Sequence, residues 1–180
     1  GRIQCRPFFW TPEVGIQERS RRDHVAYDVW AKQGHLLTTP GATIDYDWVA
    51  RQVLDLAQEW DFHQIAFDRW RIDTFSAALK RQGADQTFIE KFVPFGQGFK
   101  DMAPALDGLE SVLLGNRMDH AMHPVLTMCA ANAVVLGDPA GNRKLDKAKS
   151  TGRIDGMVAL AMAVGTSKLA EPRLASFWES

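Results

Sequence analysis

The stretch Ile65-Ala66-Phe67-Asp68-Arg69-Trp70 places an acid at the end of a short apolar run, where a buried strand would give way to a loop. Far downstream, Arg153-Ile154-Asp155-Gly156 places a second acid at the head of the apolar stretch from Met157 to Val164, which is typical of a helix. If the fold brings these carboxylates together, they can hold a hard divalent cation between them. The pattern therefore favours a metal-dependent site of the kind that nucleases use.

Strands and helices are predicted to alternate outward from this stretch in both directions. Strands are expected at 3–10, 36–39, 65–68, 92–95 and 134–136. Helices are expected to begin at an N-cap at Thr11 and after a cap at Asp45, and to span residues 27–33, 102–114 and 125–133. Two more are expected, one from about Phe75 to a stop at Gly83 and one from Ile154 to about Leu169. Residues 143–152 are expected to form a polar loop. This alternation predicts an α/β domain with a mixed sheet.

Composition places the chain among globular domains. Its 180 residues are 46% hydrophobic and 24% charged, enough to bury one core. The net charge of −1 provides no general basic field, so a polyanion would have to bind a local patch. Two cysteines, Cys5 and Cys129, are too few for a disulfide framework and are expected to be reduced, as in cytosolic proteins. No apolar run is long enough to span a bilayer, and the absence of an initiator Met indicates a piece of a longer protein.

Each candidate metal ligand also has a purely structural explanation. Asp68 can cap a helix or pair with Arg69 or Arg71, and Asp155 can lie in a first helical turn because the helix dipole favours an acid there. Further residues could extend the site, although caps, turns and surface positions also explain them: Asp73, Asp119, His120 and His123.

The densest basic stretch of the chain leads directly into Asp155. It contains Arg143, Lys144, Lys147, Lys149 and Arg153. A solvated loop would explain these residues, but basic groups beside a carboxylate site are also what a nuclease needs to hold a phosphodiester. The chain lacks the Gly-x-x-x-x-Gly-Lys-Ser/Thr motif, so we expect no ATP hydrolysis by a phosphate loop in this piece.

A series of collinear motifs resembles the nuclease domain of the large terminase subunit of tailed phages. The motifs are Pro7-Phe8-Phe9-Trp10, Tyr27-Asp28-Val29-Trp30, Thr39-Pro40-Gly41, the stretch from Ile65 to Trp70, Phe95-Gly96-Gln97-Gly98-Phe99, His123-Pro124-Val125-Leu126 and the stretch from Asp146 to Gly156. They cover most of the chain in order, which makes the resemblance specific.

The resemblance implies a ribonuclease H-like mixed sheet flanked by helices, and an endonuclease that cuts concatemeric viral DNA during packaging. It implies that Asp68 and Asp155 hold two Mg²⁺ or Mn²⁺ ions, with in-line attack of water on a phosphodiester of double-stranded DNA. Arg69, Lys147, Lys149 and Arg153 are then candidates for DNA contact. The implied partners are the terminase small subunit, the portal and an upstream ATPase domain, in the host cytoplasm and without a membrane.

One departure from the family pattern affects the metal site. Family members carry a hairpin with a Gly-x-Asp-type first strand upstream of the segment that matches Ile3 to Trp10, and this sequence begins after it. The sheet is therefore expected to lack its first strands and the site its first acid, so that this piece alone is expected to have little activity. Two alternatives remain: a non-catalytic module that binds DNA or portal protein, and another ribonuclease H-like enzyme such as a resolvase or transposase.

Overall fold

The computed structural model describes residues 2–69 and 72–167. Its helices are α1 (Ile16–Asp23), α2 (Tyr27–Lys32), α3 (Tyr46–Glu59), α4 (Ile72–Arg81), α5 (Gln86–Ile89), α6 (Phe99–Leu114), α7 (Pro124–Asn132) and α8 (Asp155–Thr166). Its strands are β1 (Ile3–Gln4), β2 (Trp10–Pro12), β3 (Leu37–Thr39), β4 (Ile65–Asp68), β5 (Phe92–Phe95), β6 (Met118–Asp119), β7 (Val135–Gly137) and β8 (Arg143–Leu145). The predicted mixed α/β class is confirmed.

The strands of the described residues form separate pairs and no continuous sheet. Three pairs are parallel: β1 with β6, β2 with β3, and β4 with β5. The fourth, β7 with β8, is an antiparallel hairpin. In the register of the β4–β5 pair, Asp68 lies opposite Phe95. The carboxyl end of β4, which carries Asp68, thus lies beside the end of β5 and the turn that follows it.

The expected strand over 3–10 is interrupted, because β1 ends at Gln4 and β2 begins only at Trp10. Two further predictions about local structure are wrong. The expected helix start at Thr11 is instead part of β2, because Thr11 and Pro12 pair with Thr38 and Thr39 of β3, and α1 begins only after Gly15. The expected loop at 143–152 begins as strand β8, which pairs with β7 and is held to α6 by ion pairs from Arg143. In both places a long-range partner overrides the local signal.

Several other predictions are confirmed. The side chain of Asp45 accepts hydrogen bonds from the backbone N–H groups of Asp47 and Trp48 and so caps α3. Gly34 follows α2 with a φ of 80°, the left-handed conformation that glycine adopts without a steric penalty. The strands at 65–68 and 92–95 have the expected bounds. The last helix is observed to Thr166, and its expected end at Leu169 lies outside the described residues.

The main hydrophobic core lies between α6 and α8. Met102, Leu109 and Val112 of α6 pack with Val158 and Ala161 of α8. A second, smaller cluster joins α3 to α4 through Ala50, Ala78 and Leu79, which are fully buried. Among the described residues, no helix is long and apolar enough to cross a membrane.

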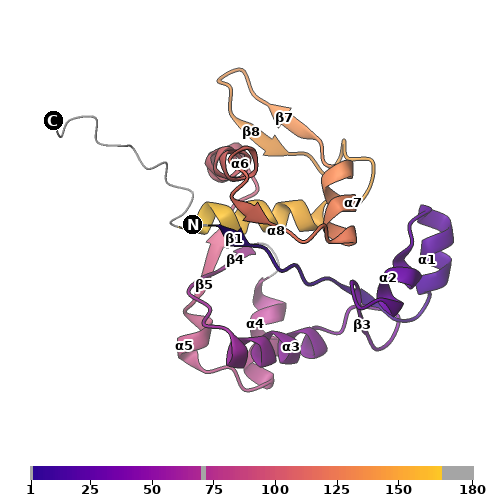
Figure 1. Cartoon of the computed structure of the whole chain (residues 1–180). Coiled ribbons are helices and arrows are strands. Elements are labelled where there is room, and N and C mark those ends of the chain that lie inside the picture. The colour runs from indigo at the N-terminus through magenta and orange to yellow at the C-terminus, as the bar shows by residue number, and fades with distance from the viewer. Residues whose placement is uncertain (1, 70–71, 168–180) are drawn as a thin grey trace.

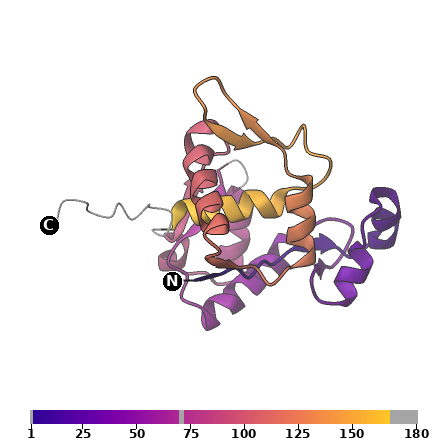
Figure 2. The same cartoon turned by 45° about the horizontal axis from the view of Figure 1, so that its top comes forward.

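The elements are arranged in two tiers with a projecting end. Figure 1 shows α6, α7, α8 and the β7–β8 hairpin above, and α3, α4 and α5 below. The helices α1 and α2 project to one side in both Figure 1 and the turned view of Figure 2, and neither helix has a buried residue. The strand β4 packs against α8, so the first candidate acid is on a strand that contacts the helix carrying the second.

Candidate active site

Asp68 ends β4 and is half-buried. Its carboxylate accepts a hydrogen bond from the side-chain amide of Gln97, with 2.6 Å between Nε2 and Oδ2. Gln97 lies in the turn between β5 and α6, so the parallel pairing of β4 with β5 brings the two side chains together. The sequence analysis did not single out Gln97, although it belongs to the Phe95-Gly96-Gln97-Gly98-Phe99 motif.

Arg69 is held beside the same turn. Its guanidinium lies 3.3 Å from the carboxylate of Asp101 in the first turn of α6. A Cβ added at Gly96 would lie against both of these groups, so a side chain there would displace the Arg69–Asp101 pair. The Arg69 side chain remains about half exposed, with an exposed fraction of 52%, and its role in DNA contact stays a prediction.

Asp155 is the first residue of α8 and is largely exposed, with 65% of its side chain accessible. The Nζ of Lys147 lies 3.5 Å from its carboxylate. This lysine therefore offsets part of the negative charge at the helix start. The prediction that Asp68 and Asp155 share one site stays a prediction, supported by the packing of β4 against α8.

The basic segment before α8 is held by its own hydrogen bonds. The side chain of Asp146 accepts from the backbone N–H groups of Ala148 and Lys149, and its carbonyl accepts from the hydroxyl of Ser150 at 2.6 Å. Asn132 at the end of α7 bonds to Thr151 and to the backbone carbonyl of Arg153. Lys147, Lys149 and Arg153 are thus exposed residues of a hydrogen-bonded turn, an organisation that sequence reasoning missed.

The remaining candidates have local structural roles. Asp119 accepts from the backbone N–H of Ala121, and His123 accepts from that of Leu126 as the N-cap of α7. Asp73 is exposed in the first turn of α4. His120 accepts, through its backbone carbonyl, a hydrogen bond from the backbone N–H of His123. Asp119 and His123 thus have local structural roles, while a part for any of the four residues in the site stays a prediction.

The side chains of Asp68 and Asp155 are of the kind that binds a divalent cation, but two carboxylates are few for a metal site. Carboxylate oxygens such as those of Asp68 and Asp155 are the ligands that Mg²⁺ and Mn²⁺ prefer. Within residues 2–69 and 72–167, no group of three or more His, Cys, Asp or Glu side chains is placed to hold a metal. No reaction step can therefore be built through a metal on these residues alone.

Both cysteines are free thiols. Burial raises the pKa of Cys5 and that of Cys129, so both are protonated near neutral pH. The sulfurs are consequently poor nucleophiles and poor metal ligands in this fold.

Comparison with known proteins connects this geometry to a family. The family described as "Terminase large subunit, endonuclease domain" matches residues 4–171. The large terminase subunit of Enterobacteria phage HK97 is 55% identical over 161 residues, which is 89% of this chain and 31% of that protein. Protein YmfN of Escherichia coli K12 is 30% identical over 172 residues, which is 92% of this chain and 36% of that protein.

Solved structures give the same result. The crystal structure of the HK97 large terminase superimposes with a TM-score of 0.84 at 53% identity, covering 91% of this chain and 33% of that one. The large terminase nuclease of thermophilic phage G20c superimposes with a TM-score of 0.53 at 13% identity, a likeness of fold alone. The chain spans about a third of the length of the HK97 protein and of YmfN. It belongs to the family of terminase large subunit endonuclease domains.

Proposed function

We propose that this chain is the main part of a ribonuclease H-like endonuclease that cuts concatemeric viral DNA during packaging. The observation that carries the proposal is the position of Asp68 at the carboxyl end of β4, against α8 and within a chain that the terminase endonuclease family matches almost throughout. The family match favours this reading over a resolvase or transposase.

The proposed roles of the side chains follow from their positions. Asp68 and Asp155 would each contribute carboxylate oxygens to Mg²⁺ or Mn²⁺, and a further acid would come from outside the described residues. If bound there, such ions would supply the Lewis-acid chemistry that activates a water molecule and stabilises the charge developing on a phosphodiester. Gln97 would orient the Asp68 carboxylate through the hydrogen bond to Oδ2. A cation bound at Asp155 would compete with Lys147, whose Nζ lies 3.5 Å from Oδ1 of that carboxylate.

The exposed basic side chains are the proposed DNA contacts. Lys147, Lys149 and Arg153 project from the turn before α8, and Arg69 lies beside the turn that holds Gln97. Contacts of this kind bind phosphates and carry no base specificity. The DNA duplex, the small subunit, the portal and an ATPase domain remain proposed partners, and the host cytoplasm is the proposed compartment.

A plasmid-nicking assay tests the proposal. A longer polypeptide that includes the residues ahead of this chain is incubated with supercoiled DNA and Mn²⁺, beside the 180-residue chain. We expect the longer protein to cut and the short chain to cut little, because two carboxylates hold two cations poorly. Asp68→Ala and Asp155→Ala should abolish cutting in the longer protein.

Asp61→Ala is the matched control, since Asp61 is an acid with 95% of its side chain exposed and pairs with Lys91. Loss of cutting in this variant would point to a general effect of charge. Strong cutting by the short chain would show that no upstream acid is needed. A longer protein that folds and binds DNA but never cuts would favour the alternative of a non-catalytic module.

A further inference from the structure

The corner between α1 and α2 is fixed by its own hydrogen bonds. The backbone carbonyl of Ser20 accepts from the N–H of Val25 at 3.1 Å, and the Ser20 hydroxyl accepts from the N–H of Asp28, also at 3.1 Å. The ring of Tyr27 packs edge-on against Trp30, with 6.1 Å between the ring centroids. Figures 1 and 2 both show this corner on the side of the molecule where α8 begins. Tyr27 is therefore held in one place on that side.

A polar contact joins this corner to Arg153, the residue two positions before Asp155. The side chains of Asp23, Tyr27 and Arg153 line the same groove as Asp155. Burial, followed by the negative charge of Asp23, raises the pKa of Tyr27, whereas the guanidinium of Arg153 lowers it. Charged groups shift a pKa in this way when they lie within about 4–6 Å. The Tyr27 hydroxyl thus lies between a carboxylate and a guanidinium.

The carboxylate in this contact is already balanced by Arg22. The Nε of Arg22 lies 2.7 Å from Oδ1 of Asp23, and its Nη2 lies 3.3 Å from Oδ2. Arg22 is the main cause of a lowered pKa of Asp23, so this carboxylate is ionised at neutral pH. Because an ionised carboxylate only accepts hydrogen bonds, the Tyr27 hydroxyl donates to Asp23 and keeps its oxygen lone pairs to accept from Arg153.

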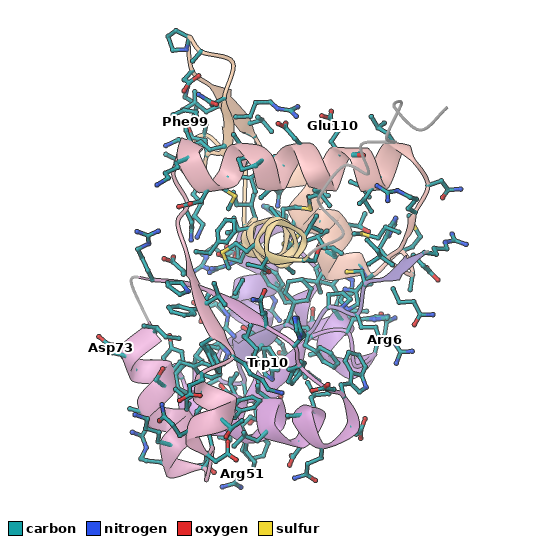
Figure 3. The ribbon with its side chains drawn as sticks, turned by 90° about the vertical axis from the view of Figure 1, so that its left-hand side faces the viewer. Arg6, Trp10, Arg51, Asp73, Phe99 and Glu110 are labelled. Atoms are coloured by element: carbon teal, nitrogen blue, oxygen red, sulfur yellow. The ribbon has the colours of Figure 1, made fainter. Side chains whose placement is uncertain are left out.

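Other basic residues of the sequence candidates have their charge offset by a carboxylate. Figure 3 shows Glu110 on the side of α6 that faces away from α8, where it binds Arg143 of β8. A carboxylate at this distance offsets the attraction that the cation would otherwise have for a phosphate. The pairs are Lys147 with Asp155, Arg69 with Asp101, and Arg143 with both Asp107 and Glu110.

Arg153, by contrast, is oriented without being neutralised. It is exposed, and its guanidinium forms no ion pair with a carboxylate within residues 2–69 and 72–167. Its backbone carbonyl accepts from Nδ2 of Asn132 at 3.2 Å, which fixes the chain just ahead of α8. The hydroxyl of Tyr27 is a neutral acceptor, so it orients the guanidinium and leaves the positive charge available.

We infer that Tyr27 is a positioning residue for the DNA substrate, which orients the guanidinium of Arg153 toward a backbone phosphate beside Asp155. The planar guanidinium can bind two oxygens of one phosphate, but only when it has the right orientation. A side chain that is oriented before binding loses less freedom when the phosphate arrives. This inference rests on the proposed function, because it takes DNA as the substrate, and it adds the α1–α2 corner to the surface that holds it.

A double-mutant cycle in DNA binding tests the inference. The longer protein of the nicking assay binds a fluorescein-labelled DNA duplex without divalent metal, and anisotropy gives the affinity at several salt concentrations. Tyr27→Phe removes the hydroxyl and keeps the ring against Trp30. We expect it to weaken binding roughly 3- to 10-fold and to reduce the salt slope by up to about 0.9. In the Arg153→Ala background, which already lacks the contact, Tyr27→Phe should change the affinity less than about twofold.

The other tyrosine of the chain provides the matched control. Tyr46 lies at the start of α3, where its ring packs against Phe75. Tyr46→Phe removes the same hydroxyl group from a position away from α8, and it should leave both the affinity for DNA and the salt slope unchanged.

The kinetics of plasmid nicking separate a positioning role from a structural one. A phosphate contact that is made equally in the bound substrate and in the transition state affects KM and leaves kcat unchanged. Tyr27→Phe should therefore raise KM and keep kcat within about twofold, with a melting temperature equal to that of Tyr46→Phe. A fall in kcat at unchanged KM, or additive effects of Tyr27→Phe and Arg153→Ala on DNA affinity, overturns the inference.

The remaining outcomes distinguish this inference from the proposed nuclease function. Tighter DNA binding by Tyr27→Phe would show that the contact withholds Arg153 from DNA, and unchanged binding by Arg153→Ala would show that Arg153 contacts no phosphate. Either result overturns the inference and leaves the nuclease proposal to be judged by plasmid nicking. Coupling in DNA binding without any nicking supports the inference and contradicts the nuclease proposal, and a longer protein that binds no DNA contradicts both.

Discussion

The crossing of α6 and α8 makes a strong prediction about Gly165. A Cβ added at Gly165 would lie 2.7 Å from the Cβ of Ala105 and 3.1 Å from Cζ of Phe95. Ala105 is almost fully buried in α6, and Phe95 lies opposite Asp68 in the β4–β5 register. Neither neighbour can move without disturbing the main core or the strand end that carries Asp68. We therefore expect Gly165→Ala to destabilise the fold.

The magnitude follows from two opposing effects. Replacing a helical glycine with alanine favours the helix by at most about 1 kcal/mol, and by less in the last turn. Overpacking a dense core costs about 1–3 kcal/mol. The expected net loss is about 1–2 kcal/mol in the free energy of unfolding, or about 2–8 °C in melting temperature for a domain of this size.

A double-mutant cycle isolates the collision. Ala105→Gly should cost about 2 kcal/mol in the parent, through lost helix propensity and a lost buried methyl group. In the Gly165→Ala background it should cost little, because it removes the colliding atom, giving a coupling of about 1–2 kcal/mol by urea unfolding. Ala163→Gly, at an exposed position of α8, is the control and should be additive with Ala105→Gly. Additivity of the Gly165 cycle, with Gly165→Ala stabilising by about 1 kcal/mol, would refute the close crossing.

Three further predictions concern other parts of the molecule. Replacing Lys147 and Lys149 with Ala should weaken DNA binding for all sequences and reduce the slope of log affinity against log salt by about 0.9 per lost contact. An unchanged slope would show that the two lysines do not contact DNA phosphates. Burial, followed by the neighbouring His35, lowers the pKa of His123 from 6.5. As pH falls through 6.5 toward the lowered folded-state pKa, the unfolded chain takes up a proton that the folded chain does not, so stability should fall. His123→Asn, which keeps a capping acceptor, should flatten this dependence in urea unfolding, and an unchanged dependence would assign it to other groups. Leu79→Ala, at a fully buried position between α3 and α4, should cost about 2–5 kcal/mol by thermal or urea unfolding, and a loss below about 1 kcal/mol would contradict the packing of that cluster.

The parts of the fold predicted correctly are those with short-range causes. The cap at Asp45 depends on a side chain reaching backbone groups two and three residues away, and the end of α2 depends on a glycine at positive φ. The missed elements β6, β8 and α5 are short, and their sequences lack strong periodicity. Thr11-Pro12 has the local signature of a helix start, but backbone pairing with β3 is the stronger interaction.

The candidate site likewise has parts that the sequence predicts and parts that it does not. An apolar run that ends in an acid, and an acid that opens an apolar helix, can be recognised from sequence because a strand and a helix each have a fixed period. The partners of those acids cannot be recognised from sequence. The amide of Gln97 reaches Asp68 because β4 pairs with β5, and Lys147 reaches Asp155 through the turn that Asp146 holds.

The sequence by itself determined the α/β class, the bounds of β4 and β5, and the two acids, because these depend on steric and hydrogen-bonding preferences within a few residues. Only the tertiary structure decided which strands pair and which side chains contact Asp68 and Arg69. The reason is physical: contacts between distant segments depend on loop closure and on how well whole surfaces pack, and no short stretch of sequence contains that information.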